Sequence, residues 1–144
     1  MPRFDKNNTK EFKEFLFNSC VHDAKLSNIE YRYAQDSIKI ELINSTFNAK
    51  IELTFRNVAI MFTIKGKDYG DREAVLSLTI EEDYLYIQTC LPKHSECMED
   101  SIYLLLQMFS GDELHIISKE VIIDITWFEC DLKWSGQNVR NRLR

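Results

Sequence analysis

Residues 37–55, SIKIELINSTFNAKIELTF, decide the fold class of this chain. Apolar side chains alternate with polar or charged ones in both halves of the stretch, at Ile38, Ile40, Leu42, Ile51, Leu53 and Phe55. This period of two is typical of strands that bury one face and expose the other. The polar segment at 44–48, NSTFN, is predicted to join the two strands as an antiparallel pair.

Charge predicts the register of this pair. We expect Ile40 to lie opposite Ile51. That register places Glu41 opposite Lys50, whereas a slip of two residues places Glu41 opposite Glu52. Like charges in directly opposed positions destabilise a sheet, so the first register is favoured.

A helix is predicted before this pair, within residues 7–20, NNTKEFKEFLFNSC. Asn8 fits an N-cap, and Glu11 three residues later fits a capping box. An apolar stripe at helical spacing is expected to face the core, formed by Phe12, Phe15, Leu16 and Cys20. Residues 1–7 are expected to be a flexible start.

Further strands are predicted by alternation and turn signals at 26–33, 58–65, 73–81, 84–91, 102–109, 113–118 and 121–128. The segment 102–109 also fits helical spacing, but Gly111 favours a strand, because it suits the first central position of a two-residue type II′ turn. The polar segment 92–100 is expected to cross between sheets. The aromatic residues Trp127, Phe128 and Trp134 are expected to belong to a strand and to close the core; several of them exposed together would instead mark an interface. One helix and about nine short antiparallel strands predict a mainly β, α+β domain, either a sandwich or an open barrel, that spans residues 1–144.

Composition places limits on function. The chain has 144 residues and a net charge of −5, yet residues 133–144 form a basic tail without an acid. The remainder is therefore strongly acidic, which disfavours nucleic acid as a partner and favours a basic protein. There is no secretion signal and no apolar run long enough to span a membrane, so we expect a cytoplasmic protein with free cysteines and no membrane association.

Motifs that carry chemistry are scarce. No nucleotide-binding loop, nucleophile elbow or zinc-protease motif is present, and we expect no cofactor and no catalytic residue. The spacing of Cys90, His94 and Cys97 resembles half of a metal site, completed by Cys20, His22 or Cys130, but it lacks paired C-x-x-C knuckles. We therefore expect no bound metal.

Two pairs remain as candidate site residues. His22 and Asp23 could form a base and its orienting carboxylate, but adjacent residues rarely face one another, and we expect them to satisfy backbone groups after the helix. If Lys119 and Glu120 form a tight turn, His115 lies opposite Asp124 across a hairpin. That arrangement suits a structural polar pair better than a catalytic one, because no nucleophile is evident beside it.

The chain also resembles a type of small bacterial protein of unknown function. The shared features are the HD junction and first strand in VHDAKLSNIEYRY (21–33), followed by IKIELI (38–43) and IELTFRNV (51–58), within residues 8–60. Some relatives of that type are assigned as immunity proteins of bacterial toxin systems. The resemblance implies the same β-rich fold and carries no catalytic residue.

Together these features favour a non-enzymatic interaction protein, such as one that neutralises a toxin. Its partner is expected to be a basic protein, and homo-oligomers could form through sheet edges. The alternative is a small-ligand-binding protein or a hydrolase-like enzyme that uses His22, His115 or Asp124.

Overall fold

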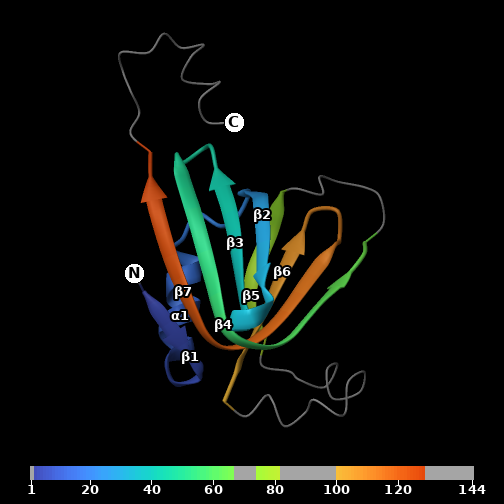
Figure 1. Cartoon of the computed structure of the whole chain (residues 1–144). Helices are drawn as coiled ribbons and strands as arrows, with labels where there is room; N and C mark the ends of the chain where they lie inside the picture. The colour runs from blue at the N-terminus through green and yellow to red at the C-terminus, as the bar shows by residue number, and fades with distance from the viewer. Residues whose placement is uncertain (1, 67–73, 82–99, 129–144) are drawn as a thin grey trace.

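The computed structural model describes residues 2–66, 74–81 and 100–128 (Figure 1). Within these ranges it confirms a mainly β structure with one short α-helix, and the seven described strands form a single antiparallel sheet that is not closed. The elements in chain order are β1 (Arg3–Asp5), the 3₁₀ turn η1 (Lys6–Asn8), α1 (Thr9–Phe17), β2 (Lys25–Arg32), the 3₁₀ turn η2 (Tyr33–Gln35), β3 (Ser37–Asn44), β4 (Ala49–Ile64), β5 (Val75–Glu81), β6 (Ile102–Met108) and β7 (Glu113–Trp127).

The strands lie in the order β2-β3-β4-β7-β6-β5, with β1 pairing separately along β7. β4 and β7 are paired from Ala49 opposite Trp127 to Ile64 opposite Glu113, and both curve strongly in Figure 1. A bulge between Val58 and Ile60 interrupts their register, next to Asn57 in a left-handed backbone conformation (φ 54°). A bulge bends a strand without ending it. The separate strands predicted at 49–55 and 58–65, and at 113–118 and 121–128, are therefore two continuous strands.

The edges of the sheet, β2 and β5, come together at one end. Lys25 forms an isolated bridge with Ala74 just before β5. The Asp23 N–H donates to the Val75 carbonyl at 2.9 Å, and the Val75 N–H donates to the Ala24 carbonyl at 2.8 Å. No further β2–β5 pairing is present among the described residues, so the sheet curls toward closure and stays open.

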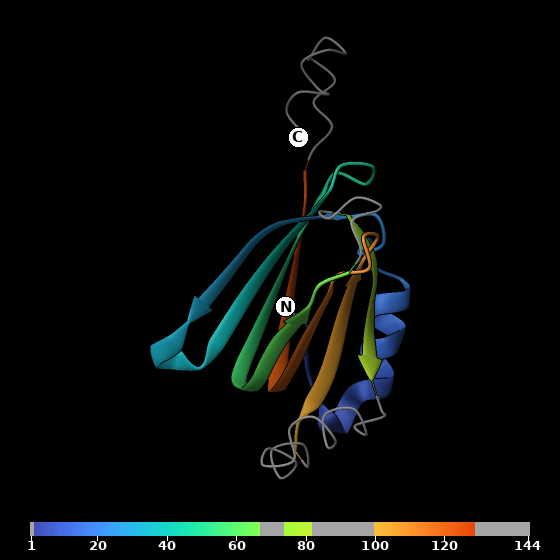
Figure 2. The ribbon, with the colours of Figure 1, turned by 90° about the vertical axis from the view of Figure 1, so that its right-hand side faces the viewer.

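Helix α1 lies against one face of the sheet, beside β1 and β5 (Figure 2). Phe12 is fully buried and stacks on Phe4 of β1 with ring centroids 4.4 Å apart. The alternating residues of β3 and β4 fill the same core, as the sequence predicted: Ile38, Ile40, Leu42, Ile51, Leu53 and Phe55. Burial of these apolar side chains is the main force that holds α1 on the sheet.

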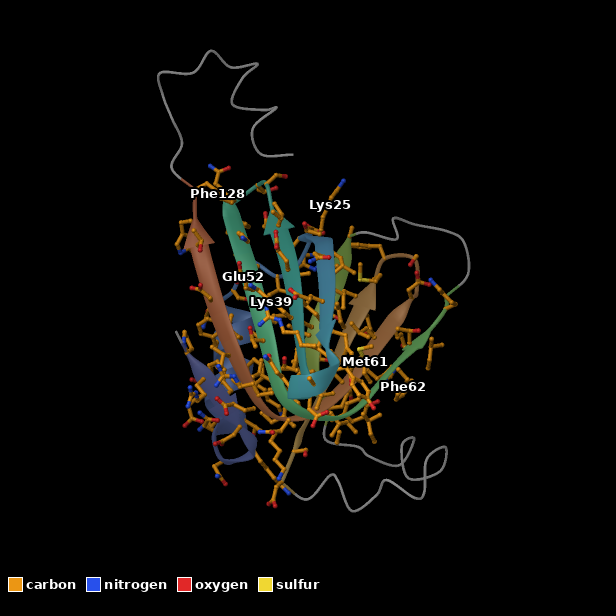
Figure 3. The ribbon with its side chains drawn as sticks, in the orientation of Figure 1. Lys25, Lys39, Glu52, Met61, Phe62 and Phe128 are labelled. Carbon is orange, nitrogen blue, oxygen red and sulfur yellow. The ribbon has the colours of Figure 1, made fainter. Side chains whose placement is uncertain are left out.

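The predicted register of β3 and β4 is wrong by two residues. Leu42 lies opposite Ile51, and Glu41 lies opposite Glu52. The like charges are tolerated because Lys39 Nζ lies 3.0 Å from Glu52 (Figure 3) and Lys50 Nζ lies 2.9 Å from it. The hydrogen bonds from Lys50 and Lys39 hold the pKa of Glu52 below its ordinary value.

The connecting loop sets this register. Asn44 pairs with Ala49, and Asn44 Oδ1 accepts hydrogen bonds from the N–H groups of Thr46 and Phe47 at 3.0 and 3.1 Å. Asn48 then adopts a left-handed conformation with φ 54°. Asparagine readily organises turns in both ways. The loop geometry therefore outweighs the single unfavourable charge pair.

The strand prediction for residues 102–109 is confirmed by β6, but the predicted type II′ turn after it is wrong. The Gly111 N–H donates to the Met108 carbonyl at 2.9 Å, so Phe109 and Ser110 are the central residues of the turn. Gly111 follows them with φ 87°. A turn followed by a left-handed glycine is the common three-residue hairpin loop, and glycine accepts this φ because it has no Cβ.

The N-terminal segment also differs from its prediction. Residues 3–5 form β1 where a flexible start was expected. Asn8 is the N-cap residue of α1, but its side chain does not cap that helix, and the predicted box with Glu11 is wrong. Asn8 instead forms a capping box with Asp5 around η1. The helix ends at Phe17, short of Cys20.

Several predictions fall outside the described ranges: the strand at 84–91, the crossing segment at 92–99, the metal half-site at Cys90, His94 and Cys97, and the basic tail. Within the ranges that are described, no helix is both long enough and apolar enough to cross a membrane.

Candidate functional site

A groove of about 740 Å³ runs between α1 and the second half of β7. Apolar side chains and backbone from three elements form much of its lining, contributed by Pro2, Phe4, Phe15, Ile123, Ile125 and Trp127. The sequence folds this way because Phe4 contacts both Phe12 and Phe15, with ring centroids 4.4 and 5.5 Å away. These contacts fix α1 beside β1. The helix side that carries Glu11, Glu14 and Phe15 therefore faces the C-terminal half of β7.

Three acidic residues also line the groove: Glu11 and Glu14 on α1, and Asp124 on β7, whose side chain points to the sheet face opposite that of Ile123 and Ile125. Glu11 and Glu14 are exposed to solvent. Across residues 2–66, 74–81 and 100–128, none of the three carboxylates lies within ion-pair distance of a basic side chain. Asp124 interacts electrostatically with Lys50 of β4, so the uncompensated negative charge of the groove comes from Glu11 and Glu14. This charge lies above an apolar lining and attracts cationic groups.

The edge of β7 beside the groove carries free backbone groups. β1 pairs with β7 only opposite Glu120, Val121 and Ile122, and the Ile123 N–H donates to the Pro2 carbonyl at 3.0 Å. Because bonding directions alternate along a strand, the N–H and C=O of Ile125 point to the same side as those of Ile123. No described strand lies beside Ile125 or Trp127 on that side. An unpaired edge of this kind can accept another strand.

Exposed aromatic side chains lie at both walls of the groove or next to them. Trp127 is 60% exposed, and Phe17, the last residue of α1, is 89% exposed. The prediction that Trp127 and Phe128 close the core is therefore wrong: Phe128 is also exposed, although its N–H donates to the Asn48 carbonyl at 2.6 Å. Large exposed aromatic side chains are enriched where proteins bind other proteins.

The His22–Asp23 pair lies at the junction between α1 and β2. Both side chains are well exposed, and His22 Nε2 lies 3.5 Å from Asp23 Oδ1, so the two face each other more closely than predicted. Asp23 has φ 65°, and its own backbone N–H donates to the Val75 carbonyl of β5; the expected role of its side chain, to accept from nearby N–H groups, stays a prediction. The His22 ring lies 5.9 Å from that of Phe109. Neither His22 nor Asp23 is part of the groove.

Cys20 and Asn44 organise this junction from the inside. Cys20 is buried as predicted, and burial raises the pKa of its thiol. Asn44 is 1% exposed, and its Nδ2 donates to the carbonyls of Cys20 and His22 at 2.8 and 3.3 Å. Sequence reasoning missed this role of Asn44, because a loop asparagine does not reveal which distant carbonyls its side chain reaches.

The predicted hairpin that pairs His115 with Asp124 does not exist. Both residues lie on the continuous strand β7, separated by about 30 Å of extended chain. His115 lies opposite Phe62 of β4 and Leu105 of β6, whereas Asp124 lies opposite Glu52. Of the four candidate site residues, only Asp124 lines the groove.

His115 belongs instead to a chain of polar side chains across β5, β6 and β7. It is 5% exposed, with Nδ1 bonded to the Tyr103 hydroxyl at 2.5 Å and Nε2 bonded to Glu113 Oε1 at 2.9 Å. The chain continues from Glu113 to the Gln107 amide at 3.2 Å, and from there to Ser77 at 3.1 Å. The His115 ring also stacks on Phe62, 4.3 Å away. Such mutually satisfied groups, buried at His115 and Tyr103 and half-buried in the rest of the chain, fit a structural role in the sheet.

Among the described residues, no group of three or more His, Cys, Asp or Glu side chains is placed to hold a metal ion. Comparisons with known proteins add no relative: no protein-family model matches the chain, and a search of curated proteins found no match.

Proposed function

We propose that this chain is a non-enzymatic binding protein that holds a basic, extended segment of another protein in the groove between α1 and β7. The observation that carries the proposal is the combination of uncompensated carboxylates, an apolar lining and a free strand edge at one place. Each feature favours a different property of the ligand: positive charge, apolar side chains and an extended backbone.

An extended segment can satisfy all three at once. Its backbone would pair with Ile125 and continue the sheet beside β7, as in other cases of strand addition. Alternate side chains of a strand point to opposite faces, so those on the α1 face could lie beside Glu11, Glu14 and Phe15, and those on the other face could reach Asp124. The acidic character of the chain would speed the encounter with a basic partner.

An immunity protein that neutralises a basic toxin is one protein of this kind, as the sequence resemblance suggests. Such a protein acts by stoichiometric binding and needs no catalytic group. A cytoplasmic location with free cysteines also belongs to this proposal.

The test uses a synthetic peptide of alternating lysine and valine, with an alternating glutamate and valine peptide as the charge control. We expect the chain to bind the lysine peptide and not the glutamate peptide in fluorescence anisotropy, with affinity that falls as salt is added. Lack of binding to the lysine peptide, or equal binding of both peptides, would contradict the proposal.

Variants then locate the binding surface. Replacing Glu11 and Glu14 by Gln removes two groove carboxylates and should weaken binding. The matched control replaces Glu81 and Asp100, which lie outside the groove, by Gln and Asn and should leave binding unchanged. Equal effects of the two double variants would show that net charge, and not the groove, determines binding.

Ile125→Pro separates edge pairing from charge. Proline removes an N–H that points toward the groove and leaves the β4 side of the ladder intact, a position that tolerates proline. We expect this variant to stay folded, as checked by thermal unfolding, and to lose peptide binding. Retained binding would refute strand addition. Size-exclusion chromatography of the free chain tests the competing occupant, because a dimer that Ile125→Pro dissociates would mean that a second copy fills the groove.

A further inference from the structure

A second hollow lies on the sheet across β2, β3 and β4, away from the groove. It encloses about 280 Å³ and is lined by Arg32, Gln35, Ser37, Thr54, Arg56 and Asn57. Every lining residue carries hydrogen-bonding groups, and the two charged ones are both arginines. The charged residues of this hollow are therefore basic, whereas those of the groove are acidic. The chain as a whole has a net charge of −5.

Strand pairing brings the two arginines together. Arg32 lies opposite Ser37 in the β2–β3 pair. Ile38 lies opposite Phe55 in the β3–β4 pair, so Ser37 is level with Arg56. The arginines therefore flank Ser37 from the two neighbouring strands, about 10 Å apart at the backbone. Side chains of this length can converge above the serine hydroxyl.

The positive charge of this hollow is not fully neutralised. Within the described part of the chain, Arg56 has no ion pair: its neighbour across β4 and β7, Glu120, is bound to Arg3 at 2.6 Å. Arg32 is held only through Nε, which lies 3.1 Å from Glu30 Oε1. The terminal amino groups of its guanidinium remain for a further acceptor, because arginine has five N–H donors.

We propose that this hollow, formed by Arg32, Arg56, Ser37 and Thr54, binds the phosphate group of a small phosphomonoester. Two guanidinium groups match a doubly charged phosphate, and arginine binds phosphate oxygens in pairs. Donors arrive from three strands and not from one plane, which suits a tetrahedral phosphate better than a planar carboxylate. The volume leaves room for a small organic group, but it is at the lower limit for ligand sites. The Glu30 carboxylate competes for Arg32 and would be displaced in part on binding.

The experiment is a titration of the full chain, followed by NMR chemical shifts and calorimetry, with inorganic phosphate, glycerol 3-phosphate, dimethyl phosphate and acetate. At a pH well above about 6, monoesters carry two charges, whereas dimethyl phosphate and acetate carry one. We expect inorganic phosphate and glycerol 3-phosphate to bind at Arg32 and Arg56, and the singly charged ligands to bind much more weakly. Equal binding of acetate would overturn the choice of phosphate, and equal binding of dimethyl phosphate would point to a diester.

Three variants identify the site. Arg56→Gln should weaken phosphate binding about tenfold or more, as expected for the loss of one charge-assisted hydrogen bond. Lys10→Gln makes the same change in net charge on α1 and should have little effect. Glu30→Gln removes the competing carboxylate and should tighten binding. Absence of phosphate binding at millimolar concentrations, or equal losses in Arg56→Gln and Lys10→Gln, would refute the site.

Discussion

The attachment of α1 to the sheet depends mainly on one buried side chain. Phe12 is 0% exposed and stacks on Phe4, so Phe12→Ala removes both its apolar contacts and the ring pair. Phenylalanine-to-alanine changes in protein cores cost about 3–5 kcal/mol, and the stacked pair accounts for about 0.5–1.5 kcal/mol of such a loss. We therefore expect Phe12→Ala to lower the free energy of unfolding by about 4 kcal/mol, a large part of the roughly 5–15 kcal/mol typical of a domain.

Urea denaturation followed by circular dichroism measures this loss, and the same helix provides a matched control. Phe17 is 89% exposed at the end of α1, so Phe17→Ala should change stability by less than about 0.5 kcal/mol. Phe12→Leu keeps much of the apolar volume and should cost about 1.5 kcal/mol or less.

The comparison within one helix makes the result decisive. If Phe12→Ala costs no more than Phe17→Ala, the helix is not held by the Phe4–Phe12 contact, and the groove wall that depends on α1 loses its physical basis. Because alanine is a better helix former than phenylalanine, a large loss in both variants would show instead that Phe17 also contributes packing contacts that its exposure does not indicate.

Other predictions test the loops and the charge cluster. Asn44→Ala should lower stability by about 2–4 kcal/mol in urea denaturation, because the carbonyls of Cys20 and His22 lose their buried donor; a change below that of Phe17→Ala would refute this role. Gly66→Ala should cost about 1–3 kcal/mol, because a Cβ would lie 2.5 Å from the Ser110 carbonyl oxygen; normal stability would show that the loop moves freely. Because the folded chain lowers the pKa of Glu52 below its ordinary value of 4.5, the stability that Glu52 contributes is present above that pH and lost as the pH falls further. Glu52→Gln should therefore be less stable than the original chain at neutral pH by about 1 kcal/mol, and equally stable in strong acid; a constant difference at all pH values would contradict the assignment.

The sequence predicted the strands better than their ends. Alternation in residues 37–55 identified β3 and the first half of β4 correctly, because burial of one face imposes a period of two. It could not separate a bulge from a turn, since both interrupt alternation at one or two residues. In β7 this led to a wrong prediction. Lys119 and Glu120 were predicted to form a turn, but pairing with β4 keeps the chain extended through them. The predicted contact of His115 with Asp124 failed for the same reason.

Register depended on contacts beyond the opposed pair. The prediction weighed Glu41 against Glu52 and rejected their pairing. In the structure, lysines diagonal to the pair lie close enough to bind Glu52, and the Asn44 loop fixes the strand offset. Pairwise charge rules are a small term, about 0.2–1 kcal/mol, so a well-formed loop outweighs them.

The sequence could predict individual residues of the candidate site, but not that these residues lie together. Glu11 and Glu14 are visible as acids beside the helical stripe, and Trp127 as an aromatic residue near the end of a strand. Nothing local reveals that α1 and the end of β7 lie together, because this depends on β1, a three-residue strand that no alternation pattern can identify. The two arginines of the phosphate hollow are likewise brought level only by the pairing of three strands.

Strand β1 also affects both proposed sites, the groove through packing and the phosphate hollow through charge. It supplies Phe4 to the groove, and its Arg3 binds Glu120, the residue opposite Arg56. In Arg3→Gln the Glu120 carboxylate would be free to pair with Arg56, so phosphate binding should weaken even though Arg3 does not line that hollow. Arg3→Gln combined with Glu120→Gln removes the competing carboxylate and should restore binding. If Arg3→Gln leaves phosphate affinity unchanged, the ion pair between Arg3 and Glu120 is not what keeps Glu120 away from Arg56. The charge of the phosphate hollow would then be independent of β1.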